Sequence, residues 1–239
     1  MTFWDHLEEL RHVLLRCIIV TVFVGILAFI FKDEVFAIIF APKSPHFLPS
    51  IFGESPDIQL INTELTRQFV VHMMTSFYVG LIVAAPYIIF ELYHFISPAL
   101  YQNEKRYTTP LVVTSYLLFM VGTLFSYFIV FPITFRFLGN YQVSDSVENL
   151  ISLESYIDTL VFLSLAMGMI FEIPILSWAL GKLGILHRQR MQQYRRHAFV
   201  IILIIAAIIT PTSDAFTLSI VSLPMYLLYE VSILLVPRK

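Results

Sequence analysis

Long apolar runs constrain this chain more than any other feature. A helix that spans a bilayer needs about 20 consecutive, mostly apolar residues, and 58% of the 239 residues are apolar. The composition therefore has room for about six or seven spans and little else. Charged residues make up only 13%, against about 25% in an ordinary soluble domain. A soluble domain, a disordered tail, a nucleic-acid binder and a disulfide-built module are excluded.

We predict an all-α integral membrane protein with six transmembrane helices, because a backbone in lipid must satisfy its own hydrogen bonds. Even a strand-like run such as Val200 to Ile209 is therefore expected to be helical. The chain is predicted to form one transmembrane domain over 1–239, in which an amphipathic helix over 1–16 precedes the spans. The predicted spans are 17–40, 68–90, 110–131, 155–181, 197–210 and 215–235, with outer loops at 41–67, 132–154 and 211–214.

The charge distribution predicts the orientation. A cleaved signal peptide is the competing interpretation of the first run, but the preceding segment is acidic and no small-residue cleavage motif follows. Lysine and arginine concentrate on the side that holds both termini, so the positive-inside rule places the termini in the cytoplasm. The residues on that side are Arg11, Arg16, Lys105, Arg106, Lys182, Arg188, Arg190, Arg195, Arg196, Arg238 and Lys239.

The fifth and sixth apolar runs are short. Residues 198–209 rise about 18 Å and residues 215–229 about 22 Å as helices, whereas the hydrocarbon core is about 30 Å thick. Local bilayer thinning would relieve this mismatch, and so would flanking side chains that reach out to the membrane surface. We therefore predict that spans five and six are short. Either the membrane is thinned beside them, or the flanking Arg195, Arg196 and Glu230 reach out to its surface.

Prolines interrupt three spans. Pro86, Pro174 and Pro224 each remove a backbone hydrogen bond and bend their helix. Three bent helices predict a concave, glove-like wall rather than a straight bundle. Asp214, in the turn between the last two spans, is predicted to be a turn residue or the N-cap of the sixth span.

Glu172 is the sharpest anomaly within the spans. It lies near the middle of the fourth span, and charged groups there usually face a cavity or a partner. Ser164, Gly168 and Glu172 follow one another at four-residue spacing, so they share one helix face. This small, polar stripe predicts contact with a polar group of another helix. The alternative is a structural hydrogen bond to the backbone that Pro174 leaves unpaired.

Carboxylates are scarce on the cytoplasmic side. A carboxylate at the membrane surface suits a guanidinium group, which it can hold through two hydrogen bonds. Weak surface ion pairs within the chain are the alternative, and the residue pattern does not choose between them. The cytoplasmic carboxylates are Asp5, Glu8, Glu9, Glu91, Glu104 and Glu230.

Catalytic motifs do not occur in the sequence. There is no H-E-x-x-H metalloprotease motif, no G-x-S-x-G elbow and no Walker lysine loop. We expect no enzyme, no metal and no cofactor. One rival function is a proton-coupled transporter of small molecules with Glu172 as proton carrier, although no internal repeat supports it. An intramembrane enzyme would need a nucleophile and base within the spans, and none is evident.

Several short motifs follow one another along the chain. They are His6–Arg11, Phe95–Tyr101 with Glu104, Phe131–Pro132, Phe171–Pro174, Thr210–Pro211 with Asp214, and Pro224–Tyr226 with Glu230. In their order and spacing these motifs resemble the TatC family, the multispanning subunits of the twin-arginine protein translocase. One departure is Leu218, where the family often has glutamine four residues after the aspartate, so a role for that glutamine does not carry over.

The resemblance implies a glove-shaped receptor for signal peptides that carry two consecutive arginines. Glu9 and Glu104 would bind the arginine pair, with Phe95, Leu10 and Arg11 beside them. Glu172 would meet the apolar part of the signal peptide or a polar residue of TatA or TatB, and Pro42 and Asp214 match positions at which the family is sensitive, for structural reasons. The implied setting is a bacterial or archaeal cytoplasmic membrane, with homo-oligomers in the receptor complex, folded cargo, no nucleic acid, and energy from the proton-motive force.

Overall fold

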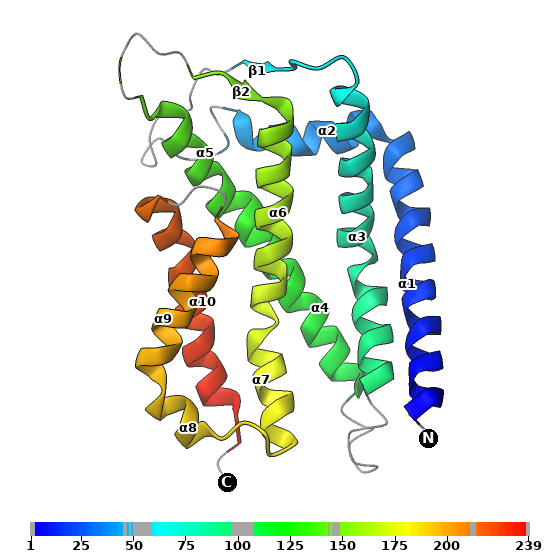
Figure 1. Ribbon diagram of the computed structural model, residues 1–239, viewed down its shortest axis with the longest axis vertical. Coiled ribbons are helices and arrows are strands. Elements are labelled where there is room, and N and C mark those ends of the chain that lie inside the picture. Colours follow the sequence, from blue (N-terminus) through cyan, green and yellow to red (C-terminus); the bar gives the residue numbers. More distant parts are fainter. Residues whose placement is uncertain are drawn as a thin grey trace. The chain divides into compact units, whose positions relative to one another are not determined.

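Helices make up most of the described chain (Figure 1), which confirms the all-helical prediction. The run from Val200 to Ile209 is helical, as expected. The computed structural model describes residues 3–44, 47, 49, 59–96, 108–142, 144, 149–210 and 214–237. Within those residues, the five helical stretches long and apolar enough to cross a membrane are Leu7–Ile30, Arg67–Phe95, Pro110–Asn140, Leu153–Lys182 and Ala215–Leu235.

The chain divides into two compact units. Unit 1 comprises residues 1–38 and 62–117, and unit 2 comprises residues 39–61 and 118–239. Unit 1 holds α1 (Phe3–Ile30), most of α2 (Lys32–Phe40), α3 (Arg67–Ile96) and the first part of α4 (Thr108–Phe125). Unit 2 holds the remainder of α4, η1 (Ala41–Lys43), β1 (Leu60–Ile61), the π-helical turn Ser126–Val130, α5 (Phe131–Asn140), β2 (Ile151–Ser152), α6 (Leu153–Phe171), α7 (Ile173–Lys182), α8 (Arg188–Gln193), α9 (Arg195–Ile209) and α10 (Ala215–Leu235).

In unit 1, α1 and α3 lie side by side (Figure 1) and pack through small side chains. Helices in lipid associate mainly through close packing, for which small residues are favourable. The contact is tightest at Gly80 of α3, where an added Cβ would lie 2.7 Å from the Thr21 carbonyl oxygen and 2.8 Å from the Gly25 nitrogen. The buried residues of α1 recur every three or four positions and are Val13, Cys17, Thr21, Gly25 and Ala28.

We expect Gly80→Ala to destabilise unit 1, because its Cβ would meet the backbone of α1. An overpacked contact of this kind costs about 1–3 kcal/mol, which thermal unfolding in detergent would register as a lower midpoint. Gly25→Ala is the matched control, since its Cβ would lie 3.3 Å from the Ser76 carbonyl oxygen, a smaller overlap. Equal destabilisation by the two substitutions would contradict this account of the packing.

The first predicted span, 17–40, is not one helix. The helix α1 is continuous from Phe3, so the predicted amphipathic segment and the first apolar run form a single rod that ends at Ile30. A turn at Phe31 separates it from α2, which leaves the direction of α1 (Figure 1). Three consecutive charged residues, Lys32–Glu34, begin α2. These charges favour a boundary because they are costly to bury in hydrocarbon.

The third helical stretch is longer than the predicted span of 110–131. It continues through Pro132 to Asn140, so the loop predicted from residue 132 begins nine residues later. Proline is tolerated here because it occupies the first turn of α5, where its missing N–H is not needed. The π-helical turn Ser126–Val130 directly precedes it and absorbs the change in hydrogen-bond register.

Aromatic side chains form much of the core at one end of unit 2. The Tyr156 ring is enclosed by Phe131 and Phe135, both in edge-to-face contact at 5.1 and 5.2 Å between centroids. Its hydroxyl group donates to the Ile39 carbonyl oxygen at 2.9 Å, so the buried polar group is satisfied. Beside this cluster, β1 and β2 pair in parallel over two residues each.

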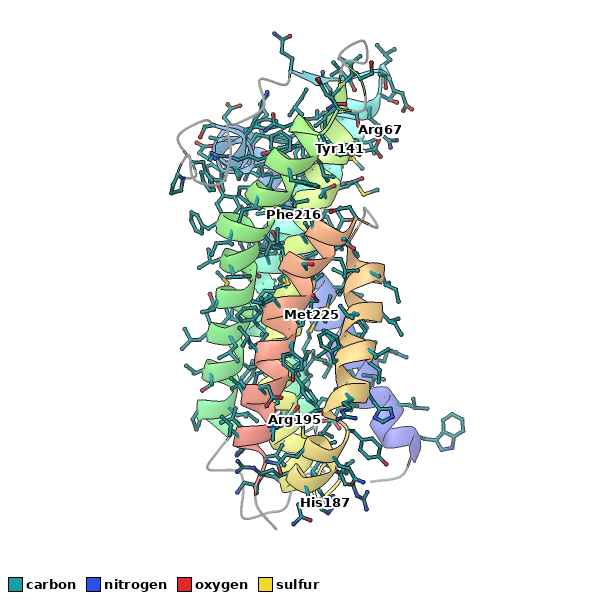
Figure 2. The ribbon with its side chains drawn as sticks, turned by 90° about the vertical axis from the view of Figure 1, so that its left-hand side faces the viewer. Arg67, Tyr141, His187, Arg195, Phe216 and Met225 are labelled. Carbon is teal, nitrogen blue, oxygen red and sulfur yellow. The ribbon has the colours of Figure 1, made fainter. Side chains whose placement is uncertain are left out.

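The prediction that the last two spans are both short is wrong for the sixth. The helix α10 has 21 residues, about 31 Å at the α-helical rise, and continues past Glu230 to Leu235. It can do so because Glu230 accepts a hydrogen bond from Arg195, which offsets its charge. The helix α9 is short, with 15 residues, about 22 Å. In Figure 2, Phe216 near the start of α10 and Arg195 at the start of α9 lie toward opposite ends of the α9–α10 pair.

Candidate functional site

Glu9, the first predicted arginine ligand, lies on the face of α1 that turns toward α3. It precedes buried Val13 by four residues and Cys17 by eight, so all three share one helix face. Glu9 is half-buried, and no described residue forms an ion pair with it. Of its predicted neighbours, Leu10 is half-buried and Arg11 is exposed.

Phe95 lies near the end of α3, half-buried. The Arg16–Glu91 ion pair joins the two helices, so the N-terminal half of α1 is beside the C-terminal half of α3. Glu9 and Phe95 lie beyond this pair in the same direction, one on each helix. The structure therefore places two predicted site residues at one end of unit 1. The other predicted ligand, Glu104, lies outside the described residues.

A polar cluster that the sequence did not predict lies between these helices. Glu91 accepts a hydrogen bond from the Tyr87 hydroxyl group at 2.7 Å, one helical turn earlier on α3. Its other carboxylate oxygen faces Arg16 of α1, at 3.6 Å from Nη1. The Glu91 side chain is 8% exposed and that of Arg16 is 61% exposed. Tyrosine four residues before glutamate was the available signal, because such pairs meet on a helix surface.

Unit 2 contains the same arrangement of groups. Glu230 of α10 accepts from Tyr226 at 3.1 Å, again one turn earlier, and from Arg195 Nη2 of α9 at 2.7 Å. The sequences match as well, since Tyr-Ile-Ile-Phe-Glu ends at Glu91 and Tyr-Leu-Leu-Tyr-Glu ends at Glu230. In each unit a tyrosine and an arginine from a second helix thus hold one glutamate. The pair in unit 2 is shorter, and its glutamate is more exposed, at 30%.

Glu172 interrupts the fourth helical stretch. It is the residue between α6 and α7, directly after Phe171 and two residues before Pro174. The helix predicted over 155–181 is therefore two helices, because Pro174 has no N–H to continue the ladder. The Glu172 side chain is half-buried, and its Oε1 atom lies below the surface. The Glu172 carboxylate therefore lies at the junction of α6 and α7 and not on the face of one continuous helix.

The other members of the predicted stripe pack inside unit 2. Ser164 and Gly168 are both buried. A Cβ on Gly168 would lie 2.7 Å from a ring carbon of Phe119 and 2.8 Å from Thr123 Oγ1, both on α4. Close helix packing thus explains Gly168, and neither Ser164 nor Gly168 presents a surface to a separate partner helix.

The predicted loop and kink residues have local structural roles. Asp214 is the N-cap of α10, as predicted, and its Oδ1 accepts from the Thr217 backbone N–H at 2.7 Å. Pro42 is buried within η1. Pro86 and Pro224 lie inside α3 and α10, and Pro174 lies in the first turn of α7. Within the described residues, no group of three or more His, Cys, Asp or Glu side chains could hold a metal ion.

Asp214→Ala should destabilise α10 by about 1 kcal/mol, the usual cost of losing an N-cap side chain. Asp214→Ser, which keeps an oxygen acceptor, should retain most of the stability. Thermal unfolding of the purified protein in detergent would compare the two. If the serine variant were as unstable as the alanine variant, capping would not be the structural role of Asp214.

Comparison with known proteins places this geometry in context. The profile of the family described as Sec-independent protein translocase protein (TatC) matches residues 5–224. The chain is 36% identical over 236 residues to the TatC protein of Aquifex aeolicus, covering 98% of this chain and 94% of that protein. It is 33% identical over 228 residues to that of Escherichia coli K12, covering 95% and 85%.

Solved structures agree with these matches. The fold is similar to a crystal structure described as the twin arginine translocase receptor TatC, with a TM-score of 0.80 and 36% sequence identity. That match covers 96% of this chain and 97% of the other. A second crystal structure of such a receptor, in DDM, matches with a TM-score of 0.82 over 97% of this chain and 99% of the other.

Proposed function

This chain belongs to the TatC family, and we propose that its Glu9 and Glu104 bind the two arginines of a twin-arginine signal peptide. The chain is a multi-pass membrane protein and a receptor subunit for Sec-independent protein export. It is a translocase component and not an enzyme, so the family assignment displaces both the small-molecule transporter and the intramembrane enzyme.

The position of Glu9 carries the proposal. Its carboxylate is half-buried at the end of α1 that also holds Phe95 of α3, and no described residue neutralises it. A partly desolvated carboxylate favours a ligand that brings charge and two parallel N–H donors, which is what guanidinium supplies. Glu104 follows α3 in the chain by eight residues, so it can contribute the second carboxylate at the same end of unit 1.

We propose that the protein crosses the cytoplasmic membrane six times, with both termini in the cytoplasm. Five helical stretches have the length to cross, and α9 would be the sixth span. At about 22 Å, α9 requires a thinner membrane or polar flanks that reach the surface, as Arg195 and Arg196 at its start can do. The proline-interrupted helices would then form a concave wall that the apolar part of the signal peptide follows.

Glu172 is proposed to contact the bound signal peptide or a polar residue of TatA or TatB. Its half-buried carboxylate lies at a helix break inside an apolar stretch. An ionisable group in such a position is energetically costly and usually has a function. On α6, Gly168 packs against α4 one turn before Glu172, and Ser164 is buried one turn earlier still. We propose that docking of the arginine pair precedes this contact, and that recruitment of TatA-type subunits, receptor self-association and the proton-motive force complete export of the folded cargo.

Glu9→Gln and Glu104→Gln should each weaken binding of a synthetic twin-arginine signal peptide by about tenfold or more, since each leaves one guanidinium without a charged acceptor. Fluorescence anisotropy with the receptor in lipid nanodiscs would measure the dissociation constant. Glu8→Gln is the matched control, because it removes the same charge from an exposed position one residue away. Unchanged affinity in both Glu9 and Glu104 variants would refute the receptor site.

Glu172→Gln should leave binding of the arginine pair unchanged but reduce photocrosslinking from residue 173 to the signal peptide's apolar part or to TatA and TatB. The substitution removes the charge and keeps the side-chain shape. Glu154→Gln is the control, because it removes a carboxylate from the opposite end of α6. Crosslinking equal to that of the unmodified receptor would show that Glu172 has no part in these contacts.

A further inference from the structure

We infer that Glu91 and Tyr87 form a further guanidinium subsite, which Arg16 fills in the free receptor and an arginine of the signal peptide takes over on binding. This inference rests on the proposed function, because it extends the same binding site along α1 and α3. Glu91 is one of the few carboxylates on the predicted cytoplasmic side, and the proposed binding of the arginine pair by Glu9 and Glu104 gives it no role.

The geometry of Glu91 is that of a prepared acceptor. Tyr87 fixes one carboxylate oxygen at 2.7 Å with a neutral hydroxyl group, which leaves the charge on Glu91 uncompensated. With its side chain only 8% exposed, this carboxylate requires a cation, because a buried and unpaired charge is strongly unfavourable. The second carboxylate oxygen of Glu91 therefore needs a cationic partner, but this partner does not have to be Arg16.

Arg16 is a weakly held occupant. Its Nη1 atom lies 3.6 Å from Glu91, whereas charge-assisted hydrogen bonds of this type are about 2.7–2.9 Å long. Its side chain is 61% exposed, so Arg16 can move into water at little cost in solvation. The corresponding pair in unit 2 is different, because Arg195 hydrogen-bonds Glu230 at 2.7 Å and is less exposed, at 47%.

The position of Glu91 suits an arginine pair. Glu9 precedes Arg16 by seven residues, which is two turns on the same side of α1 and about 10 Å along its axis. Phe95 follows Glu91 by one turn of α3, about 6 Å along the axis. Adjacent side chains of an extended peptide point to opposite sides, so two consecutive arginines can reach two separate carboxylates. Guanidinium has five N–H donors, so Glu91 would hold one of the two guanidinium groups together with Glu9 or Glu104, and all three carboxylates would contribute to binding.

Arg16 would then act as a built-in competitor. A receptor whose binding site is mostly occupied by its own side chain binds its ligand more weakly. Its apparent dissociation constant is the intrinsic constant divided by the fraction of time that the site is open. An incoming lysine is a poor replacement, because it cannot supply the planar, paired donors of guanidinium. The exchange would therefore select arginine over other cationic peptides at the cost of some affinity.

The test measures binding of a fluorescent twin-arginine peptide to the full-length receptor in nanodiscs. Arg16→Gln should tighten binding by at least about threefold, because it removes the competitor. Glu91→Gln should weaken binding by at least about tenfold, and Arg16→Gln should have no effect in the Glu91→Gln background. Arg195→Gln is the matched control, since it opens the equivalent pair in unit 2 and should leave the affinity unchanged.

Unchanged or weaker binding by Arg16→Gln would overturn the inference, because a purely structural clamp predicts that direction. A persisting Arg16→Gln effect in the Glu91→Gln background would overturn it as well. If Glu91→Gln does not yield folded protein, Tyr87→Phe replaces it, and should weaken binding because the carboxylate loses its fixed position. The Glu9→Gln and Glu104→Gln variants distinguish failure of this inference from failure of the proposed function. The proposed function predicts that both variants lose affinity whether or not Arg16 competes with the peptide.

Discussion

Hydrocarbon solvates charge poorly and offers the backbone no hydrogen-bond partner, and this constraint accounts for most of the molecule. Backbone satisfaction makes nearly every described segment helical, including runs whose β-branched residues would favour strands in water. The scarcity of charge follows from the same cost. Among the described charged residues, Arg16, Glu91, Arg195 and Glu230 form ion pairs between helices, and Glu172 lies at a helix break. A peptide ligand or a partner subunit could exploit charges in such positions.

One chemical pairing, guanidinium with carboxylate, recurs within the molecule. It joins α1 to α3 through Arg16 and Glu91, and α9 to α10 through Arg195 and Glu230. In the proposed function the same pairing recognises the ligand. The protein's internal pairs therefore resemble the contact it would make with a signal peptide. A long internal pair whose arginine is mostly in water can exchange with such a ligand, whereas a short pair whose arginine is less exposed serves mainly to hold two helices together.

The sequence was sufficient for the fold class because apolar runs, proline positions and caps act locally. Residue type and position predicted that Asp214 is a turn residue or an N-cap, and the structure shows the N-cap. Helix boundaries were harder to predict. The continuation through Pro132 depends on a π-helical turn, and the length of α10 depends on Glu230 finding Arg195 across the helix pair. Neither compensation is visible from composition or periodicity.

The candidate site was likewise predicted from the sequence only in part. Motif order pointed to Glu9, Phe95 and Glu172, and the structure places the first two at one end of unit 1. The small-residue stripe meets another helix of the same unit at Gly168, which lies against Phe119 and Thr123 of α4, so close packing is sufficient to explain that glycine. The Arg16–Glu91–Tyr87 cluster was missed because Arg16 is distant in sequence from the neighbouring Tyr87 and Glu91 and meets them only when α1 packs on α3.

The central claim is that carboxylates of unit 1 hold the arginine pair directly. Solid-state NMR would test this most directly, with a signal peptide labelled with ¹⁵N in its guanidinium groups and a receptor labelled with ¹³C in its glutamate carboxylates, in lipid. Dipolar dephasing should correspond to nitrogen–carbon distances of about 4 Å or less, and it should decrease when Glu9 and Glu104 are both replaced by glutamine, because Glu91 alone then remains as an acceptor. Strong peptide binding with no such dephasing would contradict the central claim.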